Sequence, residues 1–282
     1  MTDGIAELGD LIGAGEVVAL SGAGLSTDSG IPDYRGPSGA LRRHTPMTYQ
    51  TFVSGLPAQR RYWARSHLGW RHVARATPND GHRGVAKLQE YGALAGLITQ
   101  NVDGLQQAAG ARDVIELHGS LDRVLCLSCG ARTPRESLDR RLRRVNPAFE
   151  GRVTAINPDG DANLGDEDLD GFQVVHCLAC GGVLKPDVVF FGESVPRERV
   201  QRCFELVERA RLLLVLGSSL TVMSGYRFVL HAGKHGVPVA IVNQGPTRGD
   251  ARAALKLDAP LGEVLPRLAA VMAGGNEVVT AD

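Results

Sequence analysis

Four of the five cysteines form two short motifs of the same type. Cys126-Leu-Ser-Cys129-Gly and Cys177-Leu-Ala-Cys180-Gly are both C-x2-C turns followed by glycine, and 47 residues lie between them. Such a turn presents two thiolates on one side, so two turns can surround a zinc ion with four sulfur ligands. Four protein ligands leave no position for water or substrate, so the pattern predicts one structural zinc ion. Two disulfides are the alternative, which an intracellular location disfavours.

A glycine-rich turn follows the first apolar run, with the sequence Gly22-Ala23-Gly24-Leu-Ser-Thr27. Glycines in such a turn let the backbone approach a pyrophosphate, and the start of the next helix directs amide dipoles at it. The fingerprint of hydride-transfer enzymes has a third glycine where Thr27 stands and an acidic residue about twenty positions further on. No acidic residue lies between Asp33 and Asp80. The turn therefore predicts a bound nucleotide and disfavours a conventional dehydrogenase.

Short apolar runs alternate with amphipathic stretches, which is typical of an α/β protein. We expect a Rossmann-like parallel sheet with helices on both faces. Ligands of such a sheet bind beyond the carboxyl ends of its strands. The predicted strands are residues 16–20, 93–99, 114–117, 212–216 and 237–243. Polar residues at their ends should meet in one crevice: Gln100, Asn101, Asp103, His118, Gly217, Ser218, Ser219, Asn243 and Gln244.

Residues 121–186 break this alternation and carry both cysteine pairs, a basic segment and an acidic segment. We interpret them as a small zinc-binding module inserted into a Rossmann-like domain of residues 1–120 and 187–282. Within its first part, residues 36–80 form a helical and loop segment expected to line the cofactor site and a substrate channel. The stretch from Tyr34 to Asn79 is rich in arginine and contains no acidic residue, which is also compatible with two solvated amphipathic helices.

The chain has 31 basic and 31 acidic residues among 282, so its composition gives no support to general binding of nucleic acid. Its apolar runs fall short of the roughly 20 residues that a membrane helix needs. The N-terminus lacks the basic and apolar regions of a secretory signal. We therefore expect a cytoplasmic protein that neither spans a membrane nor binds nucleic acid directly.

Taken together, the motifs resemble those of the sirtuins, in the same order along the chain. The resemblance covers residues 13–267, and local details look most like the class II branch, which contains the mitochondrial lipoamidase sirtuin of animals and bacterial relatives. The motifs that carry it are Gly22-Ala-Gly-Leu-Ser26, Gly30-Ile-Pro-Asp-Tyr-Arg35, Thr99-Gln-Asn-Val-Asp103, Leu117-His-Gly119, the two cysteine pairs, Lys185-Pro-Asp-Val-Val-Phe-Phe-Gly-Glu193, Gly217-Ser-Ser-Leu220 and Val242-Asn243.

The resemblance implies an enzyme that consumes NAD and removes acyl groups from protein lysines. Nicotinamide leaves the ribose, the acyl oxygen attacks C1′, and the products are free lysine and O-acyl-ADP-ribose. His118 would be the general base toward a ribose hydroxyl, a step suited to imidazole because its pKa lies near neutral pH. Asn101 and Asp103 would hold the nicotinamide amide. The NAD contacts implied are Gly22, Ala23, Gly24, Thr27, Asp33, Tyr34, Arg35, Gln100, Asn101, Asp103, Gly217, Ser218, Ser219, Asn243, Gln244 and Leu261.

The acylated protein would add to the enzyme as an extended strand, bound by residues 189–193 and by a loop near residues 217–222, with Val189 and Phe191 beside the acyl-lysine. Residues 36–80 would then line the acyl pocket. Sirtuins that remove dicarboxylic acyl groups resemble this chain in carrying a Tyr-x-x-Arg pair, here Tyr62 and Arg65. If both face the channel, Arg65 would clamp an acyl carboxylate and glutaryl-like groups would be preferred to acetyl. The alternative is that Tyr62 is packed and Arg65 solvated.

Two other functions remain open at this point. The chain could be a module that binds NAD or ADP-ribose without chemistry, although a pure binding module has no need of the base His118. It could also transfer ADP-ribose to a protein nucleophile.

Overall fold

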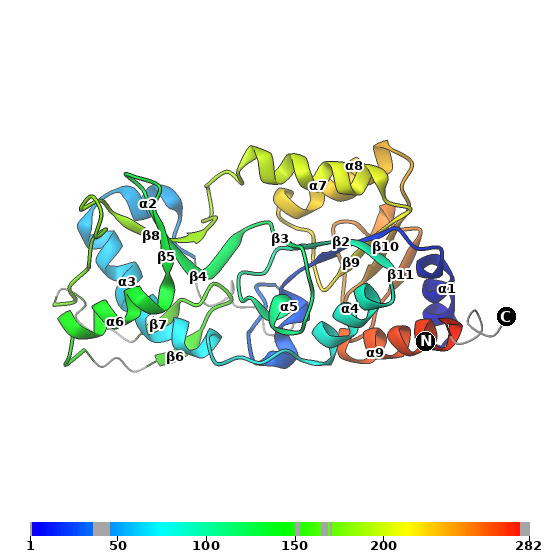
Figure 1. Ribbon diagram of the computed structural model, residues 1–282, viewed down its shortest axis with the longest axis horizontal. Helices are drawn as coiled ribbons and strands as arrows, with labels where there is room; N and C mark the ends of the chain where they lie inside the picture. The colour runs from blue at the N-terminus through cyan, green and yellow to red at the C-terminus, as the bar shows by residue number, and fades with distance from the viewer. Residues whose placement is uncertain (1, 36–45, 150–152, 165–168, 170, 277–282) are drawn as a thin grey trace.

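The computed structural model describes residues 2–35, 46–149, 153–164, 169 and 171–276, and it has a large sheet domain with a small lobe at one end (Figure 1). In the described part of the chain, six strands form one parallel sheet in the order β11-β10-β9-β1-β2-β3. Their bounds are β1 (Val17–Ser21), β2 (Leu94–Thr99), β3 (Val114–Glu116), β9 (Leu212–Leu216), β10 (Val239–Val242) and β11 (Leu255–Leu257).

The sheet is buried on both faces, because alternate residues of each strand enter different hydrophobic clusters. In β1, Val17 and Ala19 belong to one cluster and Val18 and Leu20 to the other. Strands covered on both faces read as continuous apolar runs, which explains the sequence Leu-Leu-Leu-Val-Leu of β9. One face packs on α1 (Thr2–Gly13), α4 (Asp80–Glu90) and α9 (Leu261–Asn276), and the other on α7 (Arg197–Arg209) and α8 (Met223–Lys234).

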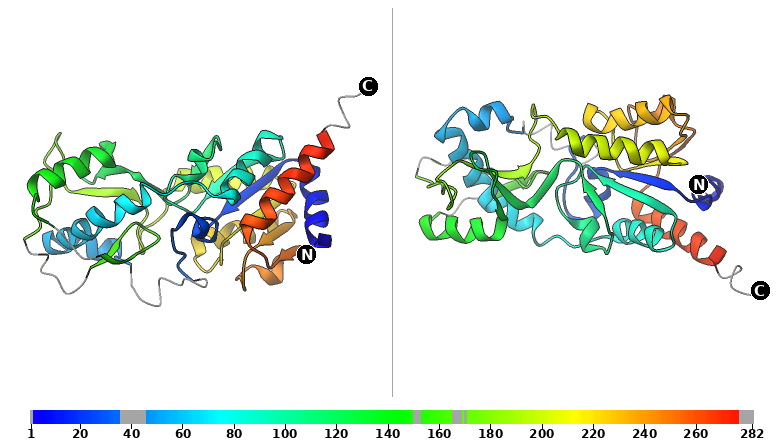
Figure 2. Two further views of the ribbon diagram at one scale, coloured as in Figure 1. Left: turned by 90° about the horizontal axis from the view of Figure 1, so that it is seen from below. Right: turned by 45° about the horizontal axis from the view of Figure 1, so that its top comes forward.

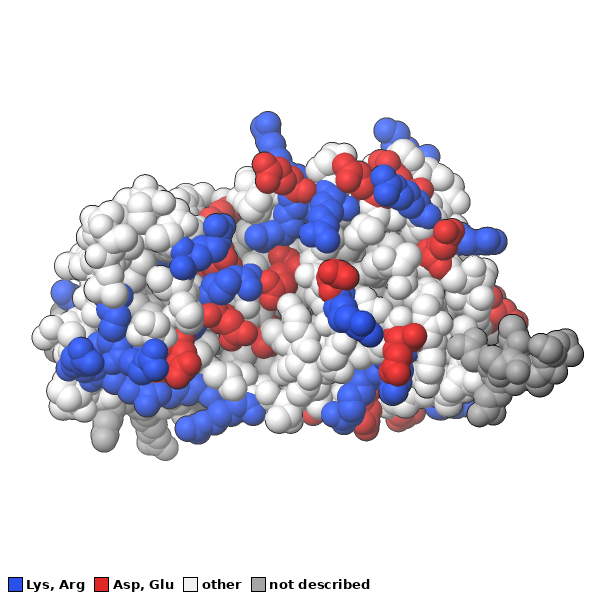
Figure 3. Space-filling model, viewed as in Figure 1, with Lys and Arg blue, Asp and Glu red and all other residues white. Residues whose placement is uncertain are grey.

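The figures show this sandwich from three directions. In Figure 1, α7 and α8 lie above the sheet and α4 and α9 below it, and Figure 2 shows α9 crossing the lower face. None of the described helices is both long and apolar enough to cross a membrane. On the face drawn in Figure 3, acidic and basic side chains are interspersed over the sheet domain, in keeping with the balanced charge.

The small lobe is built from two distant parts of the chain. Its later part holds β4 (Gly119–Cys126), β5 (Arg132–Pro134) and β8 (Leu184–Val188) in an antiparallel sheet, with α6 (Arg135–Val145) and the hairpin β6 (Val153–Ile156) and β7 (Ala162–Leu164). Its earlier part is α2 (Tyr49–Val53) and α3 (Leu56–Val73), whose buried side chains share one cluster with this later part. The lobe thus joins two segments that the sequence pattern presents as separate.

The connectivity of the sheet places a crevice at its centre. From β1 the chain moves outward through β2 to β3, then returns to the other side of β1 as β9 and continues to β10. The strand order therefore reverses between β1 and β9, and ligands of doubly wound sheets bind beyond the strand ends at such a point. The turns after these strands include the short helices η1 (Ala23–Leu25), η2 (Thr27–Ser29) and α5 (Leu105–Ala108), while η4 (Asp250–Arg252) precedes β11.

Candidate active site

Two cavities open beyond the carboxyl ends of the strands, and they meet. The first, of about 750 Å³, lies between the sheet domain and the small lobe. The second, of about 630 Å³, lies over the glycine-rich turn. Both are lined by Ala23, Tyr34, Arg35 and Gln100, so a molecule filling one can reach the other.

The second cavity collects the residues predicted to bind a nucleotide. A side chain on Gly24 would place its Cβ 2.9 Å from the carbonyl oxygen of Gly217, so glycine is needed for the turns after β1 and β9 to pack together. The predicted residues that line this cavity are Gly22, Ala23, Gly24, Thr27, Asp33, Tyr34, Arg35, Gln100, Gly217, Ser218, Ser219, Asn243, Gln244 and Leu261. Asn101 and Asp103 line the first cavity instead.

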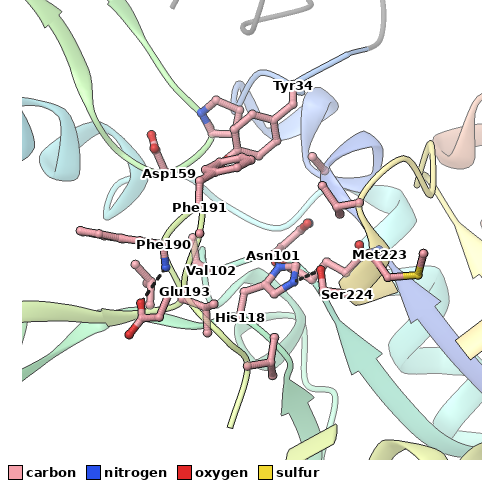
Figure 4. A pocket seen from close by; sticks show the side chains of 18 of the residues that line it. Tyr34, Asn101, Val102, His118, Asp159, Phe190, Phe191, Glu193, Met223 and Ser224 are labelled. Carbon is pink, nitrogen blue, oxygen red and sulfur yellow. Dashed lines mark hydrogen bonds between the residues drawn. The ribbon is translucent and has the colours of Figure 1, made fainter. Parts of the chain in front are cut away.

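His118 stands at the end of β3, on the wall of the first cavity (Figure 4). Its Nδ1 lies 2.9 Å from the carbonyl oxygen of Gln100, and its Nε2 lies 2.9 Å from the hydroxyl of Ser224. A carbonyl can only accept, so Nδ1 carries the proton and Nε2 presents a lone pair. Burial lowers the pKa of His118, with a smaller contribution from Arg199 and Arg227. The imidazole is therefore held neutral, in the tautomer that a base at Nε2 requires.

A second polar cluster lies beside His118 and is centred on Ser26. The Ser26 hydroxyl donates to Asp103 Oδ2 at 2.7 Å and accepts from the amide of Asn101 at 2.9 Å. Asn101 also donates to the carbonyl of Gly22 at 3.1 Å. Burial raises the pKa of the Asp103 carboxyl. The cluster fixes an amide and a carboxyl at the cavity wall, where they can bind a planar amide ligand.

Two polar residues of the site, Ser26 and His82, were not predicted from the sequence. Ser26 ends the glycine-rich motif of residues 22–26, and a hydroxyl two residues after the second glycine of a phosphate-type turn is a usable signal. His82 is fully buried on α4, and its Nε2 lies 3.4 Å from Ser26 Oγ. Its Nδ1 accepts from the backbone of Asn79 at 3.3 Å, in a capping box that starts the helix. Only the fold brings it under the site.

The substrate side of the first cavity is formed by the segment after β8. Its backbone is fixed at both ends: Val189 N donates to the carbonyl of His118 at 2.7 Å, and Tyr49 N donates to that of Phe191 at 2.9 Å. Glu193 accepts from Phe190 N at 2.9 Å and pairs with the buried Lys185 at 3.1 Å. Val189 and Phe191, the two residues expected to lie beside the acyl-lysine, both line this cavity. This segment is a rigid edge on which an extended chain could lie.

The structure brings Tyr62 to the cavity but not Arg65. Tyr62 is among the lining residues and packs on Phe190 with ring centroids 5.2 Å apart. Arg65 is buried and points to the β6–β7 hairpin, where it pairs with Asp161 at 3.0 Å and donates to the carbonyl of Ala162 at 2.8 Å. The sequence of α3 alone could not indicate this, because the partner is 96 positions further along the chain than Arg65. A carboxylate clamp by Arg65 gains no support from this position.

Comparison with known proteins decides the family. The model of the Sir2 family matches residues 22–224, which is more than two thirds of the chain and includes most of both cavities and all four clustered cysteines. The chain is a member of the Sir2 family.

Relatives and solved structures agree with this assignment over nearly the whole length. The chain is 60% identical over 268 residues to NAD-dependent protein deacetylase 1 of Streptomyces coelicolor, with 95% of this chain and 90% of the relative covered. It is 49% identical over 265 residues to an NAD-dependent protein deacetylase of Bordetella bronchiseptica, with 94% and 97% covered. A solved Sir2 protein bound to an acetylated peptide superimposes with a TM-score of 0.74 at 29% identity, covering 96% of this chain and 98% of the other.

Four of the five cysteines of this Sir2 protein form one cluster that fits a structural zinc ion. Their sulfur atoms all lie within 4.8 Å of one another, with 3.5 Å between Cys126 and Cys180 and 3.8 Å between Cys129 and Cys177. Four thiolates at about 2.3 Å from zinc lie roughly 3.8 Å apart, far beyond the length of a disulfide. The glycines after the two motifs both have positive φ, 71° and 72°, as the tight turns require. The four sulfur atoms thus lie together at the spacing that a zinc ion requires, which confirms the predicted zinc site.

The buried His82 gives the Sir2 protein a pH-dependent stability. Burial lowers the pKa of His82 from 6.5 to about 4. Between these values the unfolded chain binds a proton that the folded chain does not, so stability is complete above pH 6.5 and falls as the pH drops toward 4. We expect His82→Gln, which keeps the capping acceptor but does not titrate, to reduce this slope by up to about 1.4 kcal/mol per pH unit. Chemical denaturation from pH 4.5 to 7.5 measures it, and identical slopes would show that His82 does not titrate in this way.

Proposed function

We propose that this Sir2-family protein is an NAD-dependent protein deacetylase. The main support for the proposal is the position of His118. It is a neutral, oriented base on the wall of the first cavity, which meets the second cavity over the glycine-rich turn. A module that only bound NAD would not need such a base. The Streptomyces and Bordetella relatives are NAD-dependent protein deacetylases, which supports the same activity in this chain.

The second cavity has the donors that the ADP-ribose part of NAD requires. In the turn of residues 22–24, the amides of Gly22 and Gly24 already donate to the carbonyls of Leu216 and Gly217. The donors to the two phosphates would therefore be the amide of Ala23 and the hydroxyls of Ser218 and Ser219, which line this cavity. Asn243, directly after β10, also lines this cavity and would bind the second ribose. NAD supplies a ribose carbon that becomes electrophilic when nicotinamide departs. Asn101 and Asp103 would hold the nicotinamide amide in the neighbouring cavity.

His118 would then remove a proton from a ribose hydroxyl through Nε2. Nδ1 stays bound to the carbonyl of Gln100 throughout, which keeps the ring oriented and stabilises the imidazolium that forms. Gln100 itself is anchored by a 2.9 Å hydrogen bond from its amide to Ser218 Oγ, so the base and the phosphate turn are connected. Ser224, which now donates to Nε2, must yield this position to the substrate hydroxyl.

The acetylated protein would enter as an extended strand between residues 188–195 and residues 222–224, which line opposite sides of the first cavity. Hydrogen bonds to the peptide backbone do not depend on which side chains the peptide carries. We therefore expect the protein to accept target lysines in many sequence contexts. The lysine would extend toward His118 between Val189 and Phe191.

We further propose that this protein prefers acetyl and other uncharged acyl groups to carboxylated ones. Arg65 is paired with Asp161, so its charge is already neutralised. Asp159 lines the cavity near Tyr62. Burial raises the pKa of Tyr62, and the negative charge of Asp159 raises it further. A second negative charge on the acyl chain would be unfavourable there. This preference reverses the one expected from the Tyr-x-x-Arg pattern. It is compatible with the class II assignment, which we retain on the motifs alone.

Arg65→Met tests this assignment of Arg65. Removing one partner of a buried ion pair costs about 3–5 kcal/mol, so we expect a lower melting temperature and similar fractional losses of kcat/KM on acetyl-lysine and glutaryl-lysine peptides. Wild-type protein should favour the acetyl peptide. A loss confined to the glutaryl peptide would instead place Arg65 in the acyl pocket.

The proposed activity is tested by incubating an acetyl-lysine peptide with the protein, with and without NAD. We expect deacetylated peptide only when NAD is present, and one nicotinamide released for each acetyl group removed. Deacetylation without NAD would point to hydrolysis, and bound NAD without release of nicotinamide would point to a binding module.

A further inference from the structure

We propose that the C-terminal ends of α7 and α8 form a second metal site, which binds a divalent transition-metal ion such as Zn²⁺ through Glu208, His231 and His235. One ligand atom from each of these residues lies within 4.8 Å of the other two. The site is separate from the cysteine cluster and is made of different donors. It is also accessible from solvent, since Glu208 and His235 are exposed and His231 is half-buried.

The three donor side chains lie close together at the ends of the two helices. His231 lies in the last turn of α8, and His235, four residues further on, caps its C-terminal end. The two rings stack, with centroids 4.4 Å apart. Oε1 of Glu208, in the last turn of α7, lies 2.8 Å from Nε2 of His231 and 3.9 Å from Nε2 of His235. Ligand atoms about 2.0–2.1 Å from zinc in a tetrahedral site are roughly 3.3 Å apart. The two observed separations lie on either side of this value, so small side-chain rotations would admit the ion.

The helices that carry the donors are held rigidly together. α7 and α8 run side by side above the sheet (Figure 1), and Cys203, Val207 and Phe228 are fully buried in their shared cluster. The ring of His231 also stacks on Phe204, with centroids 4.3 Å apart. A site whose ligands are fixed by packing loses less conformational entropy when it binds an ion.

The chemistry of the donors selects the kind of ion. Two imidazoles and one carboxylate suit Zn²⁺, Ni²⁺, Co²⁺ and Cu²⁺, whereas Mg²⁺ and Ca²⁺ prefer oxygen ligands. The carboxylate contributes one negative charge, and both helices direct the negative end of their dipoles to this place. Arg209 and Lys234 lie in the last turns of α7 and α8, and their positive charges partly offset this negative potential. Three protein ligands leave at least one position for water.

The site lies at the opposite end of these helices from the peptide cavity. Arg197 on α7 and Met223 and Ser224 on α8 line that cavity near the N-terminal ends of the two helices. His231 is eight residues further along α8 than Met223, which is about 12 Å of helix. An ion at this site would connect the far ends of two helices that form one side of the cavity, without touching the reacting groups.

The test is a calorimetric titration of the full-length protein, with its cysteine cluster already loaded with zinc, using Zn²⁺ and Ni²⁺ in turn. We expect one further ion per chain. His231→Ala and His235→Ala should each weaken this binding by at least about tenfold, equivalent to about 1.4 kcal/mol, and the double variant should abolish it. Glu208→Gln should weaken it while keeping the shape of the site. His72→Ala, which removes an exposed histidine outside the cluster, is the matched control.

Circular dichroism of each variant in chelator checks that the fold is intact. Co²⁺ identifies the donors, because thiolate ligands give intense charge-transfer absorption and imidazole and carboxylate ligands do not. Absence of a further ion on the wild-type protein, thiolate absorption of the added Co²⁺, or equal binding by the double variant would each overturn the proposal.

Discussion

Replacing His118 by alanine is expected to lower the rate of deacetylation by about 10²–10⁴-fold and to leave NAD binding largely intact. Loss of a positioned general base has an effect of this size. NAD affinity should survive because the glycine turns and Ser218 bind the phosphates from the second cavity, which His118 does not line. Peptide turnover and calorimetric NAD binding on the same preparation separate the two effects. His72→Ala is again the control, and near wild-type turnover by His118→Ala would exclude His118 as the base.

The same residue sets the expected pH profile. Burial lowers the pKa of His118 below its ordinary value near 6.5, so the neutral form should persist into mildly acidic solution. Turnover should therefore be constant around neutrality and decline only as the pH falls below about 6.5, where the imidazole becomes protonated and can no longer accept a proton. A decline that begins above pH 7 would contradict a depressed pKa.

Cys126→Ala is expected to lose the structural zinc and to destabilise the protein severely. Structural zinc contributes roughly 10–16 kcal/mol in zinc-finger peptides, against a total stability of about 5–15 kcal/mol for a typical domain. Even a part of that contribution therefore decides whether the small lobe folds. Activity should fall too, because the lobe supplies Tyr62 and Asp159 to the cavity. Metal analysis and the melting temperature measure these losses.

Cys203→Ala provides the contrast for this prediction. Cys203 is fully buried between α7 and the sheet, far from the zinc cluster in the fold, and burial raises the pKa of its thiol to about 12. Its removal should cost about 1 kcal/mol of packing and leave one zinc per chain. A Cys126→Ala protein with a full equivalent of zinc and an unchanged melting temperature would be incompatible with a structural zinc site at the four cysteines.

The sheet could be predicted from sequence because its strands are buried on both faces. Continuous apolar runs such as that of β9 give a strong local signal, and the polar residue that ends each run marks the carboxyl end of the strand. The five predicted strands agree with the observed ones to within two residues at each end. The edge strand β11 was missed, because its sequence Leu-Lys-Leu is three residues long and only half-buried.

The site could be predicted where a motif holds both the residue and the turn that presents it. Gly24, His118 and the cysteines are of this kind. His82 and Arg65 are not, since each acts through a partner brought near by tertiary packing, Ser26 for one and Asp161 for the other. The aspartates of the β6–β7 hairpin belong to the acidic segment of the sequence, yet Asp161 is buried and Asp159 lines the cavity. Local patterns carry no information about such pairings.

The fate of the ADP-ribose part of NAD tests the proposed chemistry most directly. The protein would be incubated with an acetyl-lysine peptide and NAD labelled in its ADP-ribose, and the products would be identified by mass spectrometry. We predict that the label appears in O-acetyl-ADP-ribose, in an amount equal to the lysine freed. Label attached to protein while the acetyl group remains on the peptide would instead show ADP-ribosyl transfer and would contradict the proposed deacetylation.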